Sequence, residues 1–446
     1  MDWNNRAVLR LLWPLIIEQL LLVTMGIADT MMVSSVGEYA VSGVSIVDAI
    51  NVLLVTAFGA LATGGAVVTS QYIGRRDYRS SCRAARQLVY AALAISLATM
   101  VLTIAFRNQV LGLIYGHIDR DVMHAARTYF LITAFSYPFL AMYNAGAALF
   151  RSMGNSRITM WVSLVVNIIN IVGNALFIFV FKIGVAGVAI STLLSRIVAA
   201  WILMGMLLSR KKALPLNLFG LLNFRLEPVM IRNILNIGIP SGIEASMFQL
   251  GKLCTSRLVT TFGTYAIAAN AVCGVINSAA FMPANAFGLA MITIVGQYVG
   301  AENYAEAKRK VVVLMKMVYT LIFTTSIVTY IFREPLLRLF NLSLEAHALS
   351  LQYLWILCVI NPVVWPLSFG LPNALRAAGD ARYCLVVGAS SMWILRISCA
   401  FFLALVLKMG PMGIYWAMVA DWFVRAFFFG WRWFGGRWQA KRVIRD

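Results

Sequence analysis

Long apolar segments recur along the whole chain and restrict it to one class of fold. Each segment can cross the ~30 Å hydrocarbon core of a bilayer as a helix, and a helix satisfies its own backbone hydrogen bonds there. Hydrophobic residues make up 61% of the sequence and charged residues only 12%, about half the charged share of a soluble domain. We therefore expect an all-α polytopic membrane protein. Twelve transmembrane helices are predicted, at residues 8–34, 43–72, 85–106, 124–149, 158–181, 184–209, 234–260, 265–298, 312–332, 349–374, 384–407 and 411–435.

Basic residues are distributed unevenly between the two sets of helix ends. Most of the 37 lysines and arginines flank one set, and short loops rich in these residues stay in the cytoplasm. The distribution predicts a multi-pass plasma (cytoplasmic, inner) membrane protein with both termini cytoplasmic. It also accounts for the net charge of +20 without a nucleic-acid partner. The basic flanks include Arg75, Arg76, Arg79, Arg83, Arg151, Arg157, Arg376 and Arg382.

The sequence repeats itself at an offset of 226 residues, which drops to 225 in one loop. Polar and glycine positions carry the repeat, so chance similarity between apolar helices does not explain it. A six-helix unit used twice predicts two lobes related by a pseudo-two-fold axis along the membrane normal, on either side of a central cavity. The matched pairs include Pro14 and Pro240, Glu18 and Glu244, Gly37 and Gly263, Gln71-Tyr72-x-Gly74 and Gln297-Tyr298-x-Gly300, and Arg151-x-x-Gly154-x-x-Arg157 and Arg376-x-x-Gly379-x-x-Arg382.

The repeat also predicts the domain boundaries. Residues 1–209 are expected to form the N-lobe with helices 1–6. Residues 210–233, which are basic and polar, would be a cytoplasmic linker. Residues 234–446 would form the C-lobe, with helices 7–12 and a basic C-terminal tail.

Helix 1 carries two acids, Glu18 and Asp29, inside an apolar run. At ~100° per residue they share one face of the helix. An ionisable group inside a bilayer is costly unless it is paired or hydrated, so each is a functional hypothesis. Glu18 and its repeat mate Glu244 both follow a proline by four residues and are expected near the middle of the membrane. Two interpretations stay open: a buried, neutral or paired carboxyl that stabilises a kink, or a cavity residue that binds cationic substrate.

Asp29 differs from Glu18 because its repeat mate is Thr255 rather than an acid. This asymmetry favours a function specific to the first half. Asn170 and Asn174 lie one turn apart on helix 5, and Thr192 lies at a similar depth on helix 6. Their oxygens could bind Na⁺ together with Asp29, although interhelical hydrogen bonding explains the pattern equally well. The first-half spans hold more acids than bases and the second-half spans more bases than acids, so a cation is expected in the first half.

The second half carries a charged group of its own in helices 11 and 12. Arg396 and Asp421 lie at matching depths, and Arg425 is one turn after Asp421. We expect an intramembrane ion cluster of these three residues that joins the two helices; a proton relay is the alternative. No catalytic residues and no further metal site are expected, because the six cysteines form no CxxC pair and the three histidines are scattered.

Taken together, these patterns resemble the multidrug and toxic compound extrusion (MATE) family over essentially the whole chain. Such transporters have a V-shaped pair of six-helix lobes and export drug-like, often cationic compounds by alternating access, driven by inward Na⁺ or H⁺ movement. The residues that carry the resemblance are Pro14, Asp29-Thr30, the two Gln-Tyr-x-Gly sequences, Arg151-x-x-Gly154-x-x-Arg157, Gly187-Val188-Ala189-Ile190-Ser191-Thr192 and Asp421-Trp422-x-x-Arg425.

The resemblance also implies a cation site. One branch of the family uses an aspartate on helix 1, an Asn and an Asp on helix 5 and a Thr on helix 6, which match Asp29, Asn170, Asn174 and Thr192. Asn174 departs from that branch, so the resemblance leaves the coupling ion, Na⁺ or H⁺, undecided. A second branch uses acids in helices 7 and 10. That route has little support here, because Phe248 lies close to where the first acid would fall and helix 10 has no acid.

The sequence therefore predicts a cation-coupled antiporter for drug-like, cationic or amphiphilic compounds. It would be a monomer surrounded by membrane lipid, with no enzymatic activity and no cofactor besides the coupling ion. A flippase for a lipid-linked precursor is the nearest alternative: Glu18 and Glu244 argue against it, and Lys252 and Arg257 favour it. A membrane-embedded prenyl transferase would need an aspartate cluster that the sequence lacks. The sequence Gly74-Arg75-Arg76-Asp77 faintly resembles a loop motif of major-facilitator carriers.

Overall fold

Turns with a left-handed backbone separate several of the helices. The computed structural model describes residues 3–116, 119–209, 216, 218, 221, 225–441 and 443–444, and these residues form helices and connecting turns without a β-strand. Gly37, for example, has φ of 136° and stands between the first two helices. Such an angle is accessible to glycine at little cost. The all-α class predicted from the apolar segments is confirmed.

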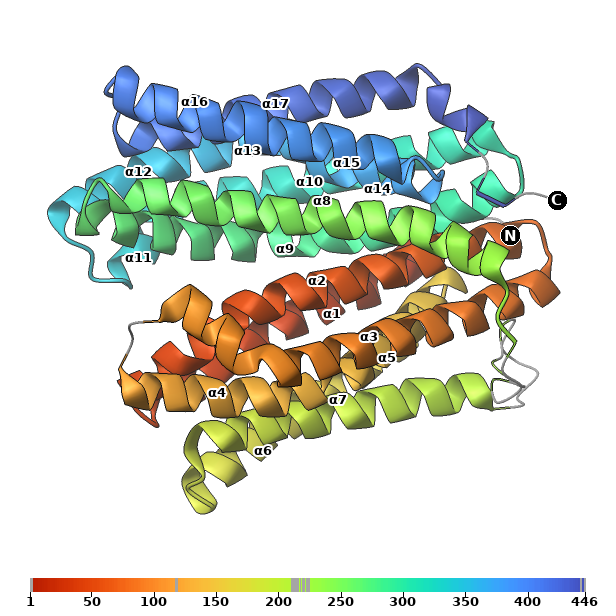
Figure 1. Cartoon of the computed structure of the whole chain (residues 1–446). Helices are drawn as coiled ribbons and strands as arrows, with labels where there is room; N and C mark the ends of the chain where they lie inside the picture. The colour runs from red at the N-terminus through yellow and green to blue at the C-terminus, as the bar shows by residue number, and fades with distance from the viewer. Residues whose placement is uncertain are drawn as a thin grey trace. The chain divides into compact units, whose positions relative to one another are not determined.

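Contacts divide the chain into two compact units, Met1–Gly242 and Ile243–Asp446. Helix α8 (Pro228–Thr260) begins in the first unit and ends in the second. Most of the predicted linker, residues 210–215, 217, 219–220 and 222–224, lies outside the described residues, so the predicted lobe boundaries stay a prediction. The other helices of the first unit, shown in red to yellow-green in Figure 1, are α1 (Asn5–Ser34), α2 (Glu38–Gly74), α3 (Tyr78–Tyr115), α4 (Arg120–Phe135), α5 (Tyr137–Ser152), α6 (Ser156–Ala175), which continues as the π turn η1 (Leu176–Val180), and α7 (Gly184–Leu208).

The second unit has more interrupted helices than the first (Figure 1). Two of its predicted spans consist of several short helical segments joined end to end. The elements that follow α8 are α9 (Thr264–Gly300), α10 (Tyr304–Ile331), α11 (Arg333–Arg338), α12 (Leu344–Val359), α13 (Asn361–Trp365), η2 (Pro366–Gly370), α14 (Leu371–Ala377), α15 (Ala381–Ser390), η3 (Ser391–Arg396), α16 (Ile397–Phe401), η4 (Phe402–Val406), α17 (Pro411–Phe434) and η5 (Arg437–Ala440).

Not every predicted helix is long and apolar enough on its own to span a bilayer. Within the described residues, nine helices meet a test of length and composition, and the bent pair Leu344–Val359 and Asn361–Ala377 makes ten. The predicted helix 124–149 is divided at Ser136, two residues before Pro138, into α4 and α5 of 16 residues each. Helix α8 has 33 residues, but polar residues interrupt its apolar run. The twelve predicted segments are all helical, and the count of twelve membrane crossings stays a prediction.

The internal repeat is visible in the backbone. Lys182 and Lys408 both have φ of 54°, and the glycines two residues later, Gly184 and Gly410, have φ of 58° and 60°. The π turns η1 and η4 also occupy matching positions, immediately before these turns. A left-handed lysine is costly for an L-residue, so its recurrence at the same offset means that both units build this connection in the same way.

Close helix packing follows each of these turns. A Cβ atom added to Gly187 in α7 would lie 2.6 Å from Cβ of Phe177, and one added to Gly413 in α17 would lie 2.7 Å from the backbone nitrogen of Ala404. Only glycine allows the helix to approach the preceding π turn this closely. In the first unit α1 packs on α6, and α6 packs on α7. The three helices that carry the predicted cation ligands are therefore neighbours.

The turn between α2 and α3 gives a test of the repeat. The Asp77 carboxylate caps α3 by accepting a hydrogen bond from the backbone nitrogen of Ser80 at 3.0 Å. Its repeat mate Asn303 caps α10 in the same way, because its Oδ1 accepts a hydrogen bond from the backbone nitrogen of Glu306 at 3.1 Å. We predict that Asp77→Ala lowers the free energy of unfolding by about 1 kcal/mol, whereas Asp77→Asn is near neutral, because both side chains cap well. Denaturant unfolding in mild detergent measures both. An equal loss in the two variants would contradict the capping role.

The same residue predicts a pH dependence. The hydrogen bonds from Ser80 lower the pKa of Asp77 below its ordinary value of 3.8. A carboxyl with a lowered pKa in the folded state stabilises the fold above the unfolded pKa and loses that contribution as pH falls through the folded pKa. The difference in stability between the wild type and Asp77→Asn should therefore change only below about pH 4.

Candidate functional site

The four residues predicted to bind a cation form one connected chain of hydrogen bonds in the first unit. Nδ2 of Asn174 donates to Oδ1 of Asp29 at 2.5 Å and lies 3.4 Å from Oδ1 of Asn170. Nδ2 of Asn170 in turn donates to Oγ1 of Thr192 at 3.3 Å. Helices α1, α6 and α7 each contribute. We call Asp29, Asn170, Asn174 and Thr192 the N-unit polar site.

The N-unit polar site is buried and retains an unused oxygen. Asn170, Asn174 and Thr192 are buried, and Asp29 is half-buried. Oδ1 of Asn174 has no hydrogen-bond donor among the described residues. An unsatisfied buried carbonyl oxygen is costly, and a hard cation is a partner that would satisfy it. The donor set of one carboxylate, two amides and a hydroxyl fits such an ion.

A second carboxylate, Asp48 on α2, was not assigned to a site from the sequence. Its Oδ1 accepts hydrogen bonds from Nδ2 of Asn51 and from the hydroxyl of Tyr129, both at 3.4 Å. The hydroxyl of Tyr137 donates to Oδ1 of Asn51 at 2.8 Å and so extends this network. The sequence did contain one signal, because Asp48 is an acid within an apolar span.

Asp29 and Asp48 share an electrostatic environment that includes Arg196. The charges of Asp48 and Arg196 both act on Asp29. The Arg196 guanidinium donates to Oγ of Ser136 at 2.5 Å, and among the described residues neither carboxylate forms an ion pair. The first unit therefore holds two carboxylates without a directly bound counter-ion.

Both carboxylate oxygens of Glu18, by contrast, have partners. The residue is 3% exposed. Nη1 of Arg151 lies 3.0 Å from Oε1, and the hydroxyl of Thr159 donates to Oε2 at 2.7 Å. These partners belong to the last turn of α5 and the first turn of α6, so Glu18 lies beside the connection between those helices rather than at the middle of the neighbouring helices.

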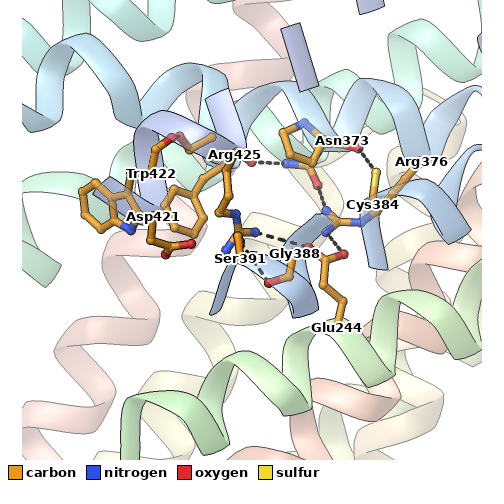
Figure 2. A network of polar contacts seen from close by, with 12 residues as sticks. Glu244, Asn373, Arg376, Cys384, Gly388, Ser391, Asp421, Trp422 and Arg425 are labelled. Atoms are coloured by element: carbon orange, nitrogen blue, oxygen red, sulfur yellow. Dashed lines mark hydrogen bonds and ion pairs between the residues drawn. The ribbon is translucent and has the colours of Figure 1, made fainter. Parts of the chain in front are cut away.

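Glu244 has the equivalent arrangement in the second unit. Nη2 of Arg376 lies 2.6 Å from Oε2, and Nη2 of Arg425 lies 3.3 Å from Oε1. Figure 2 shows the carboxylate between the two guanidinium groups. Arg151 and Arg376 are repeat mates, as are Glu18 and Glu244. Both pairs of positions recur in the sequence, but the two arginines have the pattern of basic loop flanks, so their ion pairs with Glu18 and Glu244 were not predicted.

The predicted cluster of Arg396, Asp421 and Arg425 is formed only in part. Nη1 of Arg396 lies 3.9 Å from Oδ2 of Asp421, across the two helices that the cluster was expected to join. Arg425 binds Glu244 instead and is surrounded by the rings of Phe248, Phe369 and Phe429. A guanidinium over aromatic faces gains cation–π stabilisation, more so at a buried position such as this one.

Comparisons with known proteins agree with the repeat. The model of the MatE family matches residues 14–176 and again residues 240–402. A Bacillus subtilis (strain 168) protein named as an uncharacterized transporter, YisQ, is 27% identical over 441 residues, which cover 98% of this chain and 95% of the relative. A probable multidrug resistance protein NorM of Thermotoga maritima is 25% identical over 450 residues, which cover 99% of this chain and 94% of the relative.

Solved structures share the fold. A crystal structure of MATE in the bent conformation superposes with a TM-score of 0.90 at 18% identity and covers 98% of this chain and 95% of that chain. A MOP superfamily transporter from Pyrococcus furiosus, in which a reverse polarity of the binding pocket suggests a different function, has the same TM-score and identity and covers 98% and 97%. At these identities the likeness concerns the fold alone.

The ion pair between Glu18 and Arg151 leads to a stability prediction. Arg151→Met leaves a buried carboxylate without its partner and should cost about 3–5 kcal/mol of unfolding free energy. The double variant Glu18→Gln/Arg151→Met removes both charges and should recover most of that loss. Denaturant unfolding in mild detergent gives the coupling energy, and Arg157→Met, an exposed arginine near the same turn, is the matched control. The single variant Glu18→Gln completes the cycle, and additive effects of Glu18→Gln and Arg151→Met would show that the pair does not stabilise the fold.

Proposed function

The chain belongs to the MatE family, and we propose that it is a cation-coupled antiporter that exports drug-like, cationic or amphiphilic small molecules by alternating access. The family match over both halves and the relatives named as probable multidrug resistance proteins support export of small molecules. Family membership decides against the major-facilitator alternative. We further propose a monomer in the plasma membrane, surrounded by lipid, with both termini in the cytoplasm.

One observation carries the coupling proposal: the hydrogen bonds that join Asp29, Asn174, Asn170 and Thr192. Asp29 is the acid of the N-unit polar site, and the unused oxygen belongs to the same Asn174 amide group whose nitrogen donates to Asp29. A cation that binds Asp29 would compete with the amide nitrogen of Asn174 for the carboxylate. Binding would therefore alter the contacts between α1, α6 and α7, and we propose that this change favours release of the substrate to the outside.

The two candidate coupling ions, H⁺ and Na⁺, need different ligands from these residues. A proton needs only the Asp29 carboxylate, which it neutralises. Na⁺ needs several oxygen ligands at once, and the two asparagines and Thr192 would supply them. Because position 174 is an amide, the site holds one formal negative charge, and Asp48 adds a second from nearby. The proposal includes both ions, and a gradient experiment distinguishes them.

We propose that Glu18 and Glu244 anchor helices rather than bind substrate. Both oxygens of each carboxylate already have partners: Arg151 and Thr159 for Glu18, and Arg376 and Arg425 for Glu244. Each acid follows the helix proline by four residues, so the ion pair fixes α1 or α8 where the proline removes a backbone hydrogen bond. A role in cationic substrate binding would require these pairs to open.

A flippase for a lipid-linked precursor is the second candidate function, and one observation favours it. The second unit contains one more cation beside its intramembrane acids than the apolar spans alone predict, because the half-buried Arg376 pairs with Glu244. In the first unit Arg151 likewise joins the intramembrane charges, so three acids there face two bases, against two acids and five bases in the second unit. A basic cavity wall would suit a phosphate-bearing substrate.

Export of a fluorescent cationic dye from proteoliposomes tests the coupling proposal. An imposed Na⁺ gradient and an imposed pH gradient are compared for the wild type and for Asp29→Asn. Loss of a charge-assisted contact of about 1.5–3 kcal/mol should weaken cation binding by roughly 10–100-fold, and gradient-driven export should fall accordingly. Asp77→Asn is the matched control, since it makes the same change at a capping residue. Unchanged, gradient-dependent export by Asp29→Asn would rule out coupling through this residue.

The variant Asn174→Asp distinguishes the two ions. It adds a second carboxylate directly to the N-unit polar site. If Na⁺ is the coupling ion, export should saturate at a lower Na⁺ concentration than in the wild type, because cation sites gain affinity with ligand charge. If H⁺ is the coupling ion, the Na⁺ gradient should stay without effect, and the pH at which export is half-maximal should rise, since two neighbouring carboxylates hold a proton more tightly.

A further inference from the structure

Three cationic side chains surround one aromatic ring in the second unit. The ring of Phe248 on α8 lies 5.8 Å from Nζ of Lys252, 5.9 Å from the guanidinium carbon of Arg396 and 5.4 Å from that of Arg425. The cations come from α8, η3 and α17. We call Lys252, Arg396 and Arg425 the C-unit basic cluster.

The buried donors of this cluster are not saturated. Nε of Arg396 and both Nε and Nη1 of Arg425 have no acceptor among the described residues, and the same holds for Nε1 of the neighbouring Trp422. Arg396 and Arg425 are 7% and 3% exposed, so water does not reach these groups freely. Figure 2 shows Arg425 extending past Asp421 toward Glu244. Four N–H donors without acceptors in one buried region favour an oxygen-rich ligand.

The carboxylates nearby do not balance the cluster. Both oxygens of Glu244 are taken by Arg376 and Arg425. Asp421 is the other acid, and within the described part of the chain its oxygens meet no hydrogen-bond geometry, with Nη1 of Arg396 3.9 Å from Oδ2. Together with Arg376, four cations therefore stand against two anions. An excess of positive charge among apolar helices is costly unless an anion compensates it.

A ligand could enter from the side of Lys252. The Lys252 side chain is exposed, Phe248 is half-buried, and Arg396 and Arg425 are buried. The cluster therefore extends from the surface of α8 into the interior of the unit. A lysine stem can follow apolar surface while its ammonium group meets the ligand, and the planar guanidinium groups behind it match the geometry of a carboxylate or a phosphate.

The internal repeat places Arg396 of the C-unit basic cluster at the position that Asn170 of the N-unit polar site holds in the first unit. Asn170 lies six residues before the π turn η1, and Arg396 lies six residues before the π turn η4. The repeat mate of Asp29 is Thr255. The same place in the two units thus carries a carboxylate with amide oxygens in one and a guanidinium in the other. A site that suits a cation in the first unit has a counterpart of opposite polarity in the second.

We propose that the C-unit basic cluster binds the anionic group, a carboxylate or a phosphate, of an amphiphilic ligand. Lys252 and Arg396 bind the anion, and the buried Arg425 adds its Nε and Nη1 donors. The rings of Phe248 and Phe369 contact the apolar part of the ligand. This assignment does not depend on which ion drives transport or on the direction of transport. A zwitterionic compound and a phosphate-bearing lipid both satisfy it, and they are separated by the lipid arm of the experiment.

Calorimetric titration of the full chain in a neutral maltoside detergent tests the site with phenyl phosphate as the probe and benzyl alcohol as its uncharged counterpart. The wild type should bind phenyl phosphate and not benzyl alcohol. Lys252→Gln, at an exposed position that should not disturb folding, should raise the Kd about tenfold, because it removes one charge-assisted contact. Arg257→Gln is the matched control, because Arg257 is an exposed arginine on the same helix and is not among the described cations that lie over the Phe248 ring. It should leave the Kd within about twofold.

A second variant changes affinity in the opposite direction. Asp421→Asn keeps the shape of the side chain and removes the carboxylate that competes with the ligand for Arg396, so the Kd for phenyl phosphate should fall severalfold. No binding by the wild type, equal binding of benzyl alcohol, an equal effect of Lys252→Gln and Arg257→Gln, or weaker binding by Asp421→Asn would each overturn the proposal.

The lipid arm repeats the titration in nanodiscs. If a lipid headgroup is the natural occupant, nanodiscs that contain phosphatidylglycerol should abolish phenyl phosphate binding, whereas phosphatidylcholine nanodiscs should not. If binding is equal in the two, the site takes a free anionic amphiphile. Dye export by Asp29→Asn and anion binding by Lys252→Gln are independent readouts, so the coupling proposal and this proposal can fail separately.

Discussion

A charge buried among apolar helices needs a partner, and this constraint organises both units. Glu18 has Arg151, and Glu244 has Arg376 and Arg425. The pairs with Arg151 and Arg376 join a proline-containing helix to the last turn of another helix, where the chain turns into the next segment, and Arg425 adds a partner from within α17. Removing one partner would leave a charge in a medium of low dielectric constant, which costs more than the pair contributes. Among the acids within the apolar helices, Asp29 and Asp48 lack an ion pair in the described part of the chain, and Asp29 is the one to which we assign cation coupling.

Much of the fold could be predicted from the sequence because its signals are local. Apolar length predicted twelve segments that are helical in the structure, although it missed the short helices α11 and η5, and the glycine and polar positions of the repeat predicted two similar halves. The N-unit polar site could be predicted too, since Asn170 and Asn174 share a face by helical geometry alone. The positions of helix breaks were harder. The division at Ser136 and the bent segments of α12–α14 depend on how prolines are accommodated by neighbouring helices, which spacing does not reveal.

The ion-pair partners of Glu18 and Glu244 could not be predicted from the sequence pattern alone. Arg151 and Arg376 follow apolar runs and precede glycine turns, so they have the pattern of basic loop residues. Their side chains instead reach back to carboxylates more than a hundred residues away in the chain. That choice depends on tertiary packing. The repeat offered the missing signal, since an acid and an arginine recur together at nearly the same offset, and two coupled recurrences favour contact between them.

The π turns η1 and η4 have a mechanical consequence. A π turn contains one residue more than an α-helical turn would need, so a return to α-helical hydrogen bonding would rotate the following segment by about 100°. Asn170 and Arg396 each lie six residues before such a turn, which is about 9 Å along the helix axis. The left-handed lysines Lys182 and Lys408 and the tightly packed helices α7 and α17 come directly afterwards. A rotation that begins at the N-unit polar site or at the C-unit basic cluster would thus pass through the π turn to the start of α7 or α17. The one extra residue of the π turn is the part of the backbone that could accommodate it.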